Sequence, residues 1–386
     1  MTATSALDTR PDRRGSPIPT PAMIGTRFME LRRRRGLMAT LVVVTVGIPT
    51  VFLVIRLLLH AFAPKSYGPA GGYNIFSGLV AGVMYVFGFI VAATLGATAG
   101  SNDLSEGMFR HLVVTGRSRL AIYLARIPAG LGIIVPLVAL GFTVICAVCV
   151  FAAPTTISYQ GANVPAGLSL PAFESWAGQH PDTVICDFPF RASTPPPAVP
   201  CGEGPGGRQG VKVFPVGPSG PLVPPQYTPD QLRAFAVQVA TQDYPGYSAI
   251  FLAPSVSLMV RTGLWIELEA AVGFLVGLGL ASLLGQRTVA VILMIVLEVV
   301  LTPIVSMAHL PHLSNLQRAV VGLATAHLEP GGLAFVFGGG GDRAANGGRV
   351  VSQLLPESRT VAVCVILAWL VGWTVLGAWR MVTRDA

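Results

Sequence analysis

The chain has 386 residues, of which 52% are hydrophobic and only 11% are charged. Soluble globular domains carry about 25% charged residues, so this composition argues against a soluble fold. The formal net charge of +8 does not indicate a nucleic-acid partner, because only Lys65 and Lys212 are lysines and the arginines cluster beside apolar runs. We therefore expect a membrane protein that contacts the lipid bilayer and binds no nucleic acid.

The chain begins with a polar, proline-containing stretch, residues 1–22, whose composition predicts a disordered cytoplasmic tail. Residues 23–36 then interleave apolar side chains, among them Phe28, with a run of arginines. This pattern predicts an amphipathic helix that lies in the membrane interface. The arginines of the run are Arg32, Arg33, Arg34 and Arg35. In the simpler alternative, they only anchor the first membrane span on its cytoplasmic side.

Six apolar stretches are long enough to cross a bilayer, which takes about 20 residues in a helix. Polar or turn-forming residues flank each stretch. The six stretches are residues 37–63, 76–100, 122–152, 266–285, 288–309 and 360–379. The sequence therefore predicts an all-α membrane protein with six transmembrane helices, three of them in residues 37–152 and three in residues 261–386.

Basic residues are distributed unevenly between the two sides of these spans. With the N-terminus inside, 15 basic residues fall in short cytoplasmic segments and 10 in longer external ones, while Arg56 lies within the first span. Because basic residues favour the cytoplasmic side, both termini are expected in the cytoplasm. The abundance of Arg, Ala, Gly and Pro with almost no Lys is also typical of a GC-rich bacterium, so we expect a bacterial inner (plasma) membrane.

Residues 153–260, between the third and fourth spans, form the largest external segment. Their Pro- and Gly-rich composition predicts an inserted extracytoplasmic domain of mixed, loop-rich structure. From Thr228 to about Thr241, a cap, a proline and apolar residues at helical spacing predict one helix packed on loops and strands. Cys186 and Cys201 are the only cysteines of this segment, and in an oxidising compartment we expect a disulfide between them. Two free thiols are the alternative.

Charged residues inside a span are functional candidates, because burying one in hydrocarbon costs at least about 2.5 kcal/mol. Glu298 lies near the centre of the fifth span, where it either lines a substrate pathway or bonds a neighbouring helix. Arg56 lies toward the outer end of the first span; it either pairs with Glu298 or extends to the interface, and the interface is favoured. Glu267 and Glu269 lie near the outer edge of the fourth span, where a solvated position is expected.

Residues 310–358 form the second sizeable external segment. His309, His312, His327 and Glu329 lie in or beside it and raise the question of a metal site. Their spacing matches no tight ligand motif, so no metal site is predicted.

Residues 101–119, between the second and third spans, are polar enough to leave the membrane. Apolar residues from Leu104 to Val113 nevertheless recur at helical spacing and predict a short amphipathic helix on the cytoplasmic side. In the alternative, this segment is a solvated loop whose arginines only determine the topology. The candidates for the N-terminal cap of the helix are Ser101, Asn102 and Asp103.

The same segment resembles the membrane subunits of type-2 ABC transporters, a permease family that includes bacterial drug and polysaccharide exporters. The matching features are an acidic residue with Gly, a basic residue, a turn ending in Ser-Arg, and a basic residue opening the third span. In this chain they are Glu106, Gly107, Arg110, Ser118, Arg119 and Arg126. Gly116 stands where the family frequently has Pro, and Arg126 where it usually has Lys. The resemblance covers residues 22–152 and 260–381, and leaves the 153–260 domain without a counterpart.

This resemblance implies that residues 101–119 form a coupling helix that docks on an ATPase subunit. It also implies that the interfacial helix at 23–36 faces the ATPase and that residues 313–328 form a short external re-entrant helix. The residues of the coupling helix to which the docking role is assigned are Glu106, Gly107, Arg110, Arg117 and Arg119.

The sequence does not contain the ATP-binding motif that such a transporter requires. A phosphate-binding turn needs Gly-Lys-Ser or Gly-Lys-Thr after a Gly-rich stretch, and neither occurs here. We therefore expect no catalytic residue and no cofactor on this chain, and ATP and Mg bound by a separate ATPase subunit present in two copies. Six spans form half of the pathway usual in the family, so a homodimer or a pair with a sister permease is expected.

The expected function is the outward export of a hydrophobic or amphipathic substrate, such as a drug, a lipid or an envelope precursor. The alternative is a non-transporting membrane protein whose external domain binds a ligand or an envelope partner. An intramembrane enzyme is disfavoured, because no span carries a Ser-His, paired-Asp or His-Glu-x-x-His arrangement.

Overall fold

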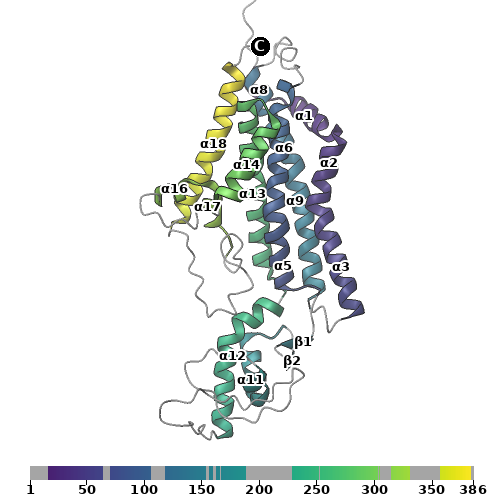
Figure 1. Ribbon diagram of the computed structural model, residues 1–386, viewed down its shortest axis with the longest axis vertical. Coiled ribbons are helices and arrows are strands. Elements are labelled where there is room, and N and C mark those ends of the chain that lie inside the picture. The colour runs from purple at the N-terminus through teal and green to yellow at the C-terminus, as the bar shows by residue number, and fades with distance from the viewer. Residues whose placement is uncertain are drawn as a thin grey trace, which may run out of the picture.

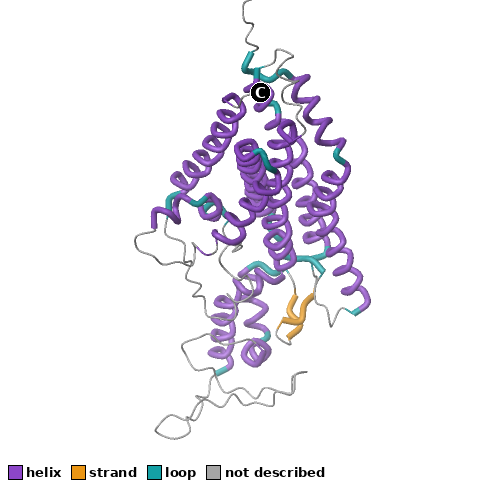
Figure 2. The backbone as a smooth tube through the Cα atoms, turned by 45° about the horizontal axis from the view of Figure 1, so that its top comes forward, coloured by secondary structure: helices purple, strands orange, loops and turns teal. Residues whose placement is uncertain are grey.

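The structure is a computed structural model that describes most of the helical chain. The described residues are 16–63, 70–105, 118–153, 156–159, 162–165, 167–187, 228–251, 253–302, 304, 314–330 and 357–383. They form a bundle of long helices, with a smaller group of helices and a β-hairpin beyond one end of the bundle (Figures 1 and 2).

The elements of the first half, in which η denotes a π-helical stretch, are α1 (Pro21–Arg33), α2 (Arg35–Val42), η1 (Val43–Gly47), α3 (Ile48–Phe62), α5 (Tyr73–Leu79), η2 (Val80–Tyr85), α6 (Val86–Ser105), α8 (Arg119–Leu124), α9 (Arg126–Phe151), β1 (Thr156–Tyr159), β2 (Ala162–Pro165), α10 (Leu170–Gln179) and α11 (Pro181–Asp187). Those of the second half are α12 (Pro229–Phe251), α13 (Val256–Leu284), α14 (Arg287–Ile295), η3 (Val296–Leu301), α16 (Ser314–Ala319), α17 (Val321–Ala326) and α18 (Arg359–Thr383).

Five helical stretches of the described residues are long and apolar enough to cross a membrane. They are Arg35–Phe62, Ile75–Ser101, Arg119–Phe151, Val256–Leu284 and Arg359–Thr383. These stretches correspond to the first four predicted spans and to the sixth. The predicted fifth span, 288–309, is helical through α14 and η3, and part of its remainder lies outside the described residues. The arrangement is compatible with the all-α membrane fold expected from the sequence.

The fourth apolar helix, α13, begins at Val256 instead of at residue 266 as predicted. Ser255 caps its N-terminus, since the Ser255 hydroxyl accepts a hydrogen bond from the Leu258 amide at 3.2 Å. The helix ends at Gly285, whose positive φ of 74° suits the left-handed conformation of a C-terminal cap. Because the helix starts so early, Glu269 falls in its middle, where the residue is only 2% exposed. The prediction of a solvated Glu269 is therefore wrong.

The same α13 forms the centre of the bundle, where it contacts α6, α9, α14 and α18. Within its apolar window 72% of the residues are buried inside the protein, compared with 22% in the first and last spans. Most of this helix packs against protein, whereas the first and last spans leave most of their apolar surface for lipid or a partner.

Glycines let α13 and α6 come into direct backbone contact. A Cβ atom at Gly277 would lie 2.6 Å from the Ala93 carbonyl oxygen, and one at Gly100 would lie 2.5 Å from the Leu278 carbonyl oxygen. A Cβ at Gly96 would collide with the carbonyl of Phe274. Small residues at four-residue spacing are a usual basis for close helix packing in membranes, because they expose backbone to backbone. The α6–α13 pair is therefore packed backbone to backbone along several turns.

The helices α16 and α17 lie beside the bundle and are held by two tryptophans. The Trp265 indole of α13 donates a hydrogen bond to the Thr325 carbonyl at 2.9 Å, and the Trp369 indole of α18 donates to the Ala319 carbonyl at 2.8 Å. All residues of α17 are buried. The helix expected at 313–328 is thus present as two short helices, separated at Val320, where the backbone is extended.

A second hydrophobic cluster joins α10, α11, α12 and the β1–β2 hairpin. Its centre is an aromatic group in which Phe173 stacks on Tyr247, with ring centroids 4.2 Å apart. The Tyr247 hydroxyl donates to the Pro165 carbonyl at 2.5 Å and accepts from the Leu168 amide at 3.1 Å, and burial raises the Tyr247 pKa. These contacts connect the hairpin to α12.

The predicted start of α12 is confirmed. Thr228 and Gln231 form a capping box, in which the Gln231 side chain accepts from the Thr228 amide at 2.9 Å, and Pro229 is the first helical residue. The expectation of a single helix is wrong for the described part of residues 153–260, which contains α10, α11, α12 and the first turn of α13 beside a two-stranded sheet. The Gly and Pro content that motivated it is concentrated in 188–227, outside the described residues.

We expect Gly96→Ala to destabilise the protein and Gly88→Ala, on the same helix, to leave it as stable or slightly more stable. The new methyl group at 96 meets the α13 backbone, and such overpacking costs about 1–3 kcal/mol. At Gly88 a Cβ would meet nothing within 4 Å, so the usual helix preference for Ala applies. Thermal unfolding in detergent measures both; equal melting temperatures would contradict the close α6–α13 contact.

Candidate functional site

One end of the bundle brings together the two ends of the predicted coupling segment. The α6 helix ends at Ser105 and α8 begins at Arg119, while α1 and the last turn of α18 lie at the same end (Figure 1). Residues 106–117 lie outside the described residues. The site is therefore built from the structure on both sides of this segment.

The carbonyl oxygen of Gly100 connects three helices at this end. It accepts a hydrogen bond from the Arg126 guanidinium of α9 at 3.0 Å and a longer one from the Ser282 hydroxyl of α13 at 3.4 Å. Arg126 is only 2% exposed, and a buried guanidinium is stable only where oxygen acceptors receive its N–H groups. Because Gly100 precedes the 106–117 segment and Arg126 follows it, this bond joins the two flanks of the segment. We call this junction of Gly100 and Arg126 the neck of the segment.

The first part of the predicted coupling helix belongs to the preceding span. Helix α6 continues unbroken through Ser105, so the expectation that Ser101, Asn102 or Asp103 caps a new helix is wrong. The reason is that Ser101 is 3% exposed and its hydroxyl donates to the Ala97 carbonyl one turn earlier, at 2.8 Å. A serine bonded in this way is an interior residue of a helix and no longer a cap.

The other side of the segment is attached to the last helix. The Ser118 hydroxyl accepts from the Ala121 amide at 3.0 Å and caps α8. Arg119 donates to the Val382 carbonyl of α18 at 3.0 Å, among the terminal carbonyls that have no partner within their own helix. Of the five residues assigned to docking, Arg119 is described and lies here. The other four, Glu106, Gly107, Arg110 and Arg117, lie outside the described residues.

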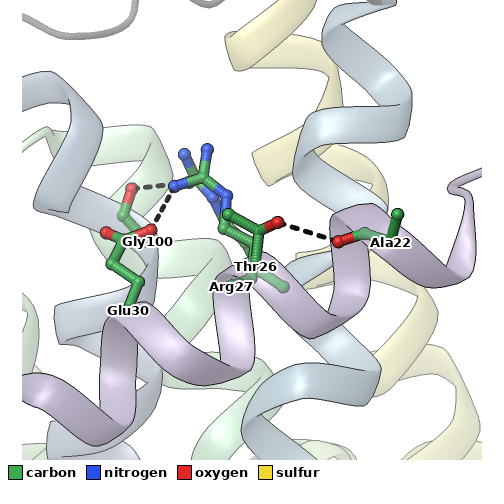
Figure 3. A network of polar contacts seen from close by, with 6 residues as sticks. Ala22, Thr26, Arg27, Glu30 and Gly100 are labelled. Carbon is green, nitrogen blue, oxygen red and sulfur yellow. Dashed lines mark hydrogen bonds and ion pairs between the residues drawn. The ribbon is translucent and has the colours of Figure 1, made fainter.

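The amphipathic helix expected at 23–36 corresponds to α1, which packs on α9. Leu31 is buried, and Phe28 packs on the core, so that a Cβ at Gly132 of α9 would lie 4.0 Å from the Phe28 ring. On its polar side, Arg27 forms an ion pair with Glu30 at 2.6 Å, in a network that includes Gly100 (Figure 3). The arginines Arg32, Arg33 and Arg35 are exposed, and the partly buried Arg34 forms the turn into α2.

The intramembrane candidates are only partly visible. Glu298 lies in η3, but its side chain is outside the described part, so a pathway role or a contact with Arg56 stays a prediction. Arg56 is half-buried in α3 and has an interaction partner in the structure.

Sequence reasoning missed two buried carboxylates. Glu269 lies in the middle of α13, and Glu357, 2% exposed, forms an ion pair with His327 in which the nearest atoms are 3.4 Å apart. For Glu269 the sequence signal is Ser255, because a capping serine at this position starts α13 at Val256 and places Glu269 near the centre of the helix. No sequence signal pairs His327 with Glu357.

The remaining predicted sites concern cysteines and metals. Cys186 lies in α11, but its side chain and all of Cys201 are outside the described residues, so the disulfide stays a prediction. Among the residues that the structure describes, no three His, Cys, Asp or Glu side chains gather in a way that would hold a metal ion.

Comparison with family models, with curated proteins and with solved structures finds no match to this chain. The resemblance to type-2 ABC permeases therefore rests on the residues around the 101–119 segment and on the order of the spans.

We expect Arg126→Gln to lower the melting temperature and to speed hydrogen exchange in the last two turns of α6. The substitution removes the charged donor that reaches the Gly100 carbonyl, and losing a buried hydrogen bond to a charged group costs about 1.5–3 kcal/mol. Arg32→Gln, at an exposed position, is the matched control and should change neither quantity. Unchanged exchange in Arg126→Gln would show that the neck of the segment is held by something else.

Proposed function

We propose that this chain is the permease subunit of an ATP-binding-cassette exporter in a bacterial inner membrane. It would cross the membrane six times, with both termini in the cytoplasm and residues 153–260 outside. The observation that carries the proposal is that both ends of the 106–117 segment are attached to the helical core. Gly100 bonds to Arg126 at one end, and Arg119 bonds to Val382 at the other. Force applied to a segment that is attached in this way is transmitted to the helices, whereas a loop without such bonds would deform instead.

The cargo of this exporter would be a hydrophobic or amphipathic molecule such as a drug, a lipid or an envelope precursor. Two copies of a separate ATPase subunit would bind ATP and Mg and press on the 106–117 segment from the cytoplasm. A second permease, identical or a sister chain, would complete the pathway. The chain's own contribution is mechanical, because it has no phosphate-binding turn.

Force on the segment has a defined route through the described contacts. Arg126 connects the segment to the end of α6, and the glycine contacts make α6 move together with α13. Only residues 252–255 separate α13 from α12, and α12 carries the second hydrophobic cluster. A rigid-body shift of α6 and α13 would therefore also move the 153–260 domain.

A second candidate function is binding of a ligand or an envelope partner by that domain without transport. It is favoured by the separate hydrophobic cluster and by an open cavity of about 680 Å³ between α10, α11 and α12. Asp182 and Arg233 both line this cavity and are exposed.

Charge reversal distinguishes the two functions. We expect the double variant Glu106→Lys with Arg110→Glu to lose co-purification of an ATPase subunit in mild detergent and to lose export, because the docking surface would carry the wrong charges. The matched control, Asp182→Lys with Arg233→Glu, makes the same exchange in the cavity of the other domain and should retain both. If the first variant still co-purifies with the ATPase subunit and still stimulates its ATP hydrolysis, the transporter proposal fails.

A further inference from the structure

The turn between α1 and α2 carries a cluster of positive charge that the transport mechanism does not use. We call Arg32, Arg33, Arg34 and Arg35 the arginine corner. Arg32 and Arg33 end α1, Arg34 forms the turn and Arg35 is the first residue of α2. The side chains of Arg32, Arg33 and Arg35 are exposed. The nearest acidic residue in sequence, Glu30, is engaged by Arg27. The charges of Arg32, Arg33 and Arg35 are therefore presented to the surroundings.

The fold places the arginine corner at the rim of the bundle. Leu31 and Phe28 hold α1 against α9, and from there α1 runs outward to the turn into α2 (Figures 1 and 2). The first apolar helix that can cross a membrane begins at Arg35. The corner thus lies where a spanning helix starts, which is the depth of lipid headgroups, and at the edge of the protein that faces lipid.

Apolar surface follows directly after the charge. Beyond the corner, Val42 and Val43 are 42% and 56% exposed, and further along the same helix Val51 is 58% exposed. A cluster of exposed arginines next to an exposed apolar strip matches a molecule with a negative head and long apolar chains. A hydrophilic soluble protein or a nucleic acid would match the arginines but would leave the strip uncovered.

We propose that the arginine corner is a binding site for an anionic phospholipid. The guanidinium groups would bind the headgroup phosphate, for which the planar arginine donors are well suited, and the acyl chains would lie along the exposed face of α2 and η1. This inference needs only a membrane-inserted chain and is independent of transport.

The test is a titration of the purified full-length protein in detergent with phosphatidylglycerol or with phosphatidylcholine, followed by native mass spectrometry. We expect phosphatidylglycerol to be retained preferentially. Each arginine replaced by Gln should weaken its binding about fivefold, so the triple variant at 32, 33 and 35 should bind it roughly a hundredfold more weakly. The triple Lys variant keeps the charge and should retain most of the binding. Inorganic phosphate alone should not displace the lipid.

The matched control replaces three exposed arginines far from the corner, Arg233, Arg261 and Arg359, by Gln. It changes the net charge equally and should bind phosphatidylglycerol like the unmodified protein. The thermal unfolding of every variant in phosphatidylcholine reports whether it is folded. The proposal is overturned if the folded corner variant binds phosphatidylglycerol normally, or if the control variant loses as much.

Discussion

The arrangement of the bundle depends on one backbone oxygen, the carbonyl of Gly100. Arg126 of α9 and Ser282 of α13 both donate to it, so three helices meet at one acceptor. The glycine contacts between α6 and α13 make this meeting possible, because a side chain at Gly100 would collide with the α13 backbone. A buried guanidinium is costly without an acceptor, and the Gly100 carbonyl, which also belongs to the backbone ladder of α6, provides one.

The bonds to the Gly100 carbonyl connect the flanks of the 106–117 segment, at one end of the bundle, with the helix that leads to the second hydrophobic cluster beyond the other end. The neck of the 106–117 segment is held on the most buried helix pair, and α13 continues through a short linker into α12 and the second hydrophobic cluster. The first and last of the apolar helices are only 22% buried and lie outside this tightly packed pair. The arginine corner belongs to the first span and not to this core, which is why its chemistry is separable from coupling.

Hydropathy predicted six spans, five of which correspond to helices long and apolar enough to cross a membrane, and capping rules predicted the start of α12. Both depend on local residue patterns. The predictions that failed concern residues whose environment depends on contacts distant in the sequence or on the true start of a helix. Ser101 looks like a cap, but it is buried within the bundle and bonds backward to the Ala97 carbonyl. Glu269 looks like an edge residue only when the start of α13 is taken from the uninterrupted apolar run, since Arg261, Thr262 and Gly263 interrupt that run after the first turn of the helix. The burial of Arg126 and its link to Gly100 span 26 positions, and no local pattern encodes such a contact.

The most direct test of this account is a double-mutant cycle between Arg126→Gln and Ser282→Ala, measured as the free energy of unfolding. Because both side chains donate to the same carbonyl, the account predicts a coupling energy of about 0.5–3 kcal/mol. Each single variant keeps one of the two side-chain donors, and only the double variant leaves the oxygen with its backbone partner in α6 alone. Strictly additive effects would contradict the shared acceptor, and with it the claim that the neck of the segment is fixed at Gly100.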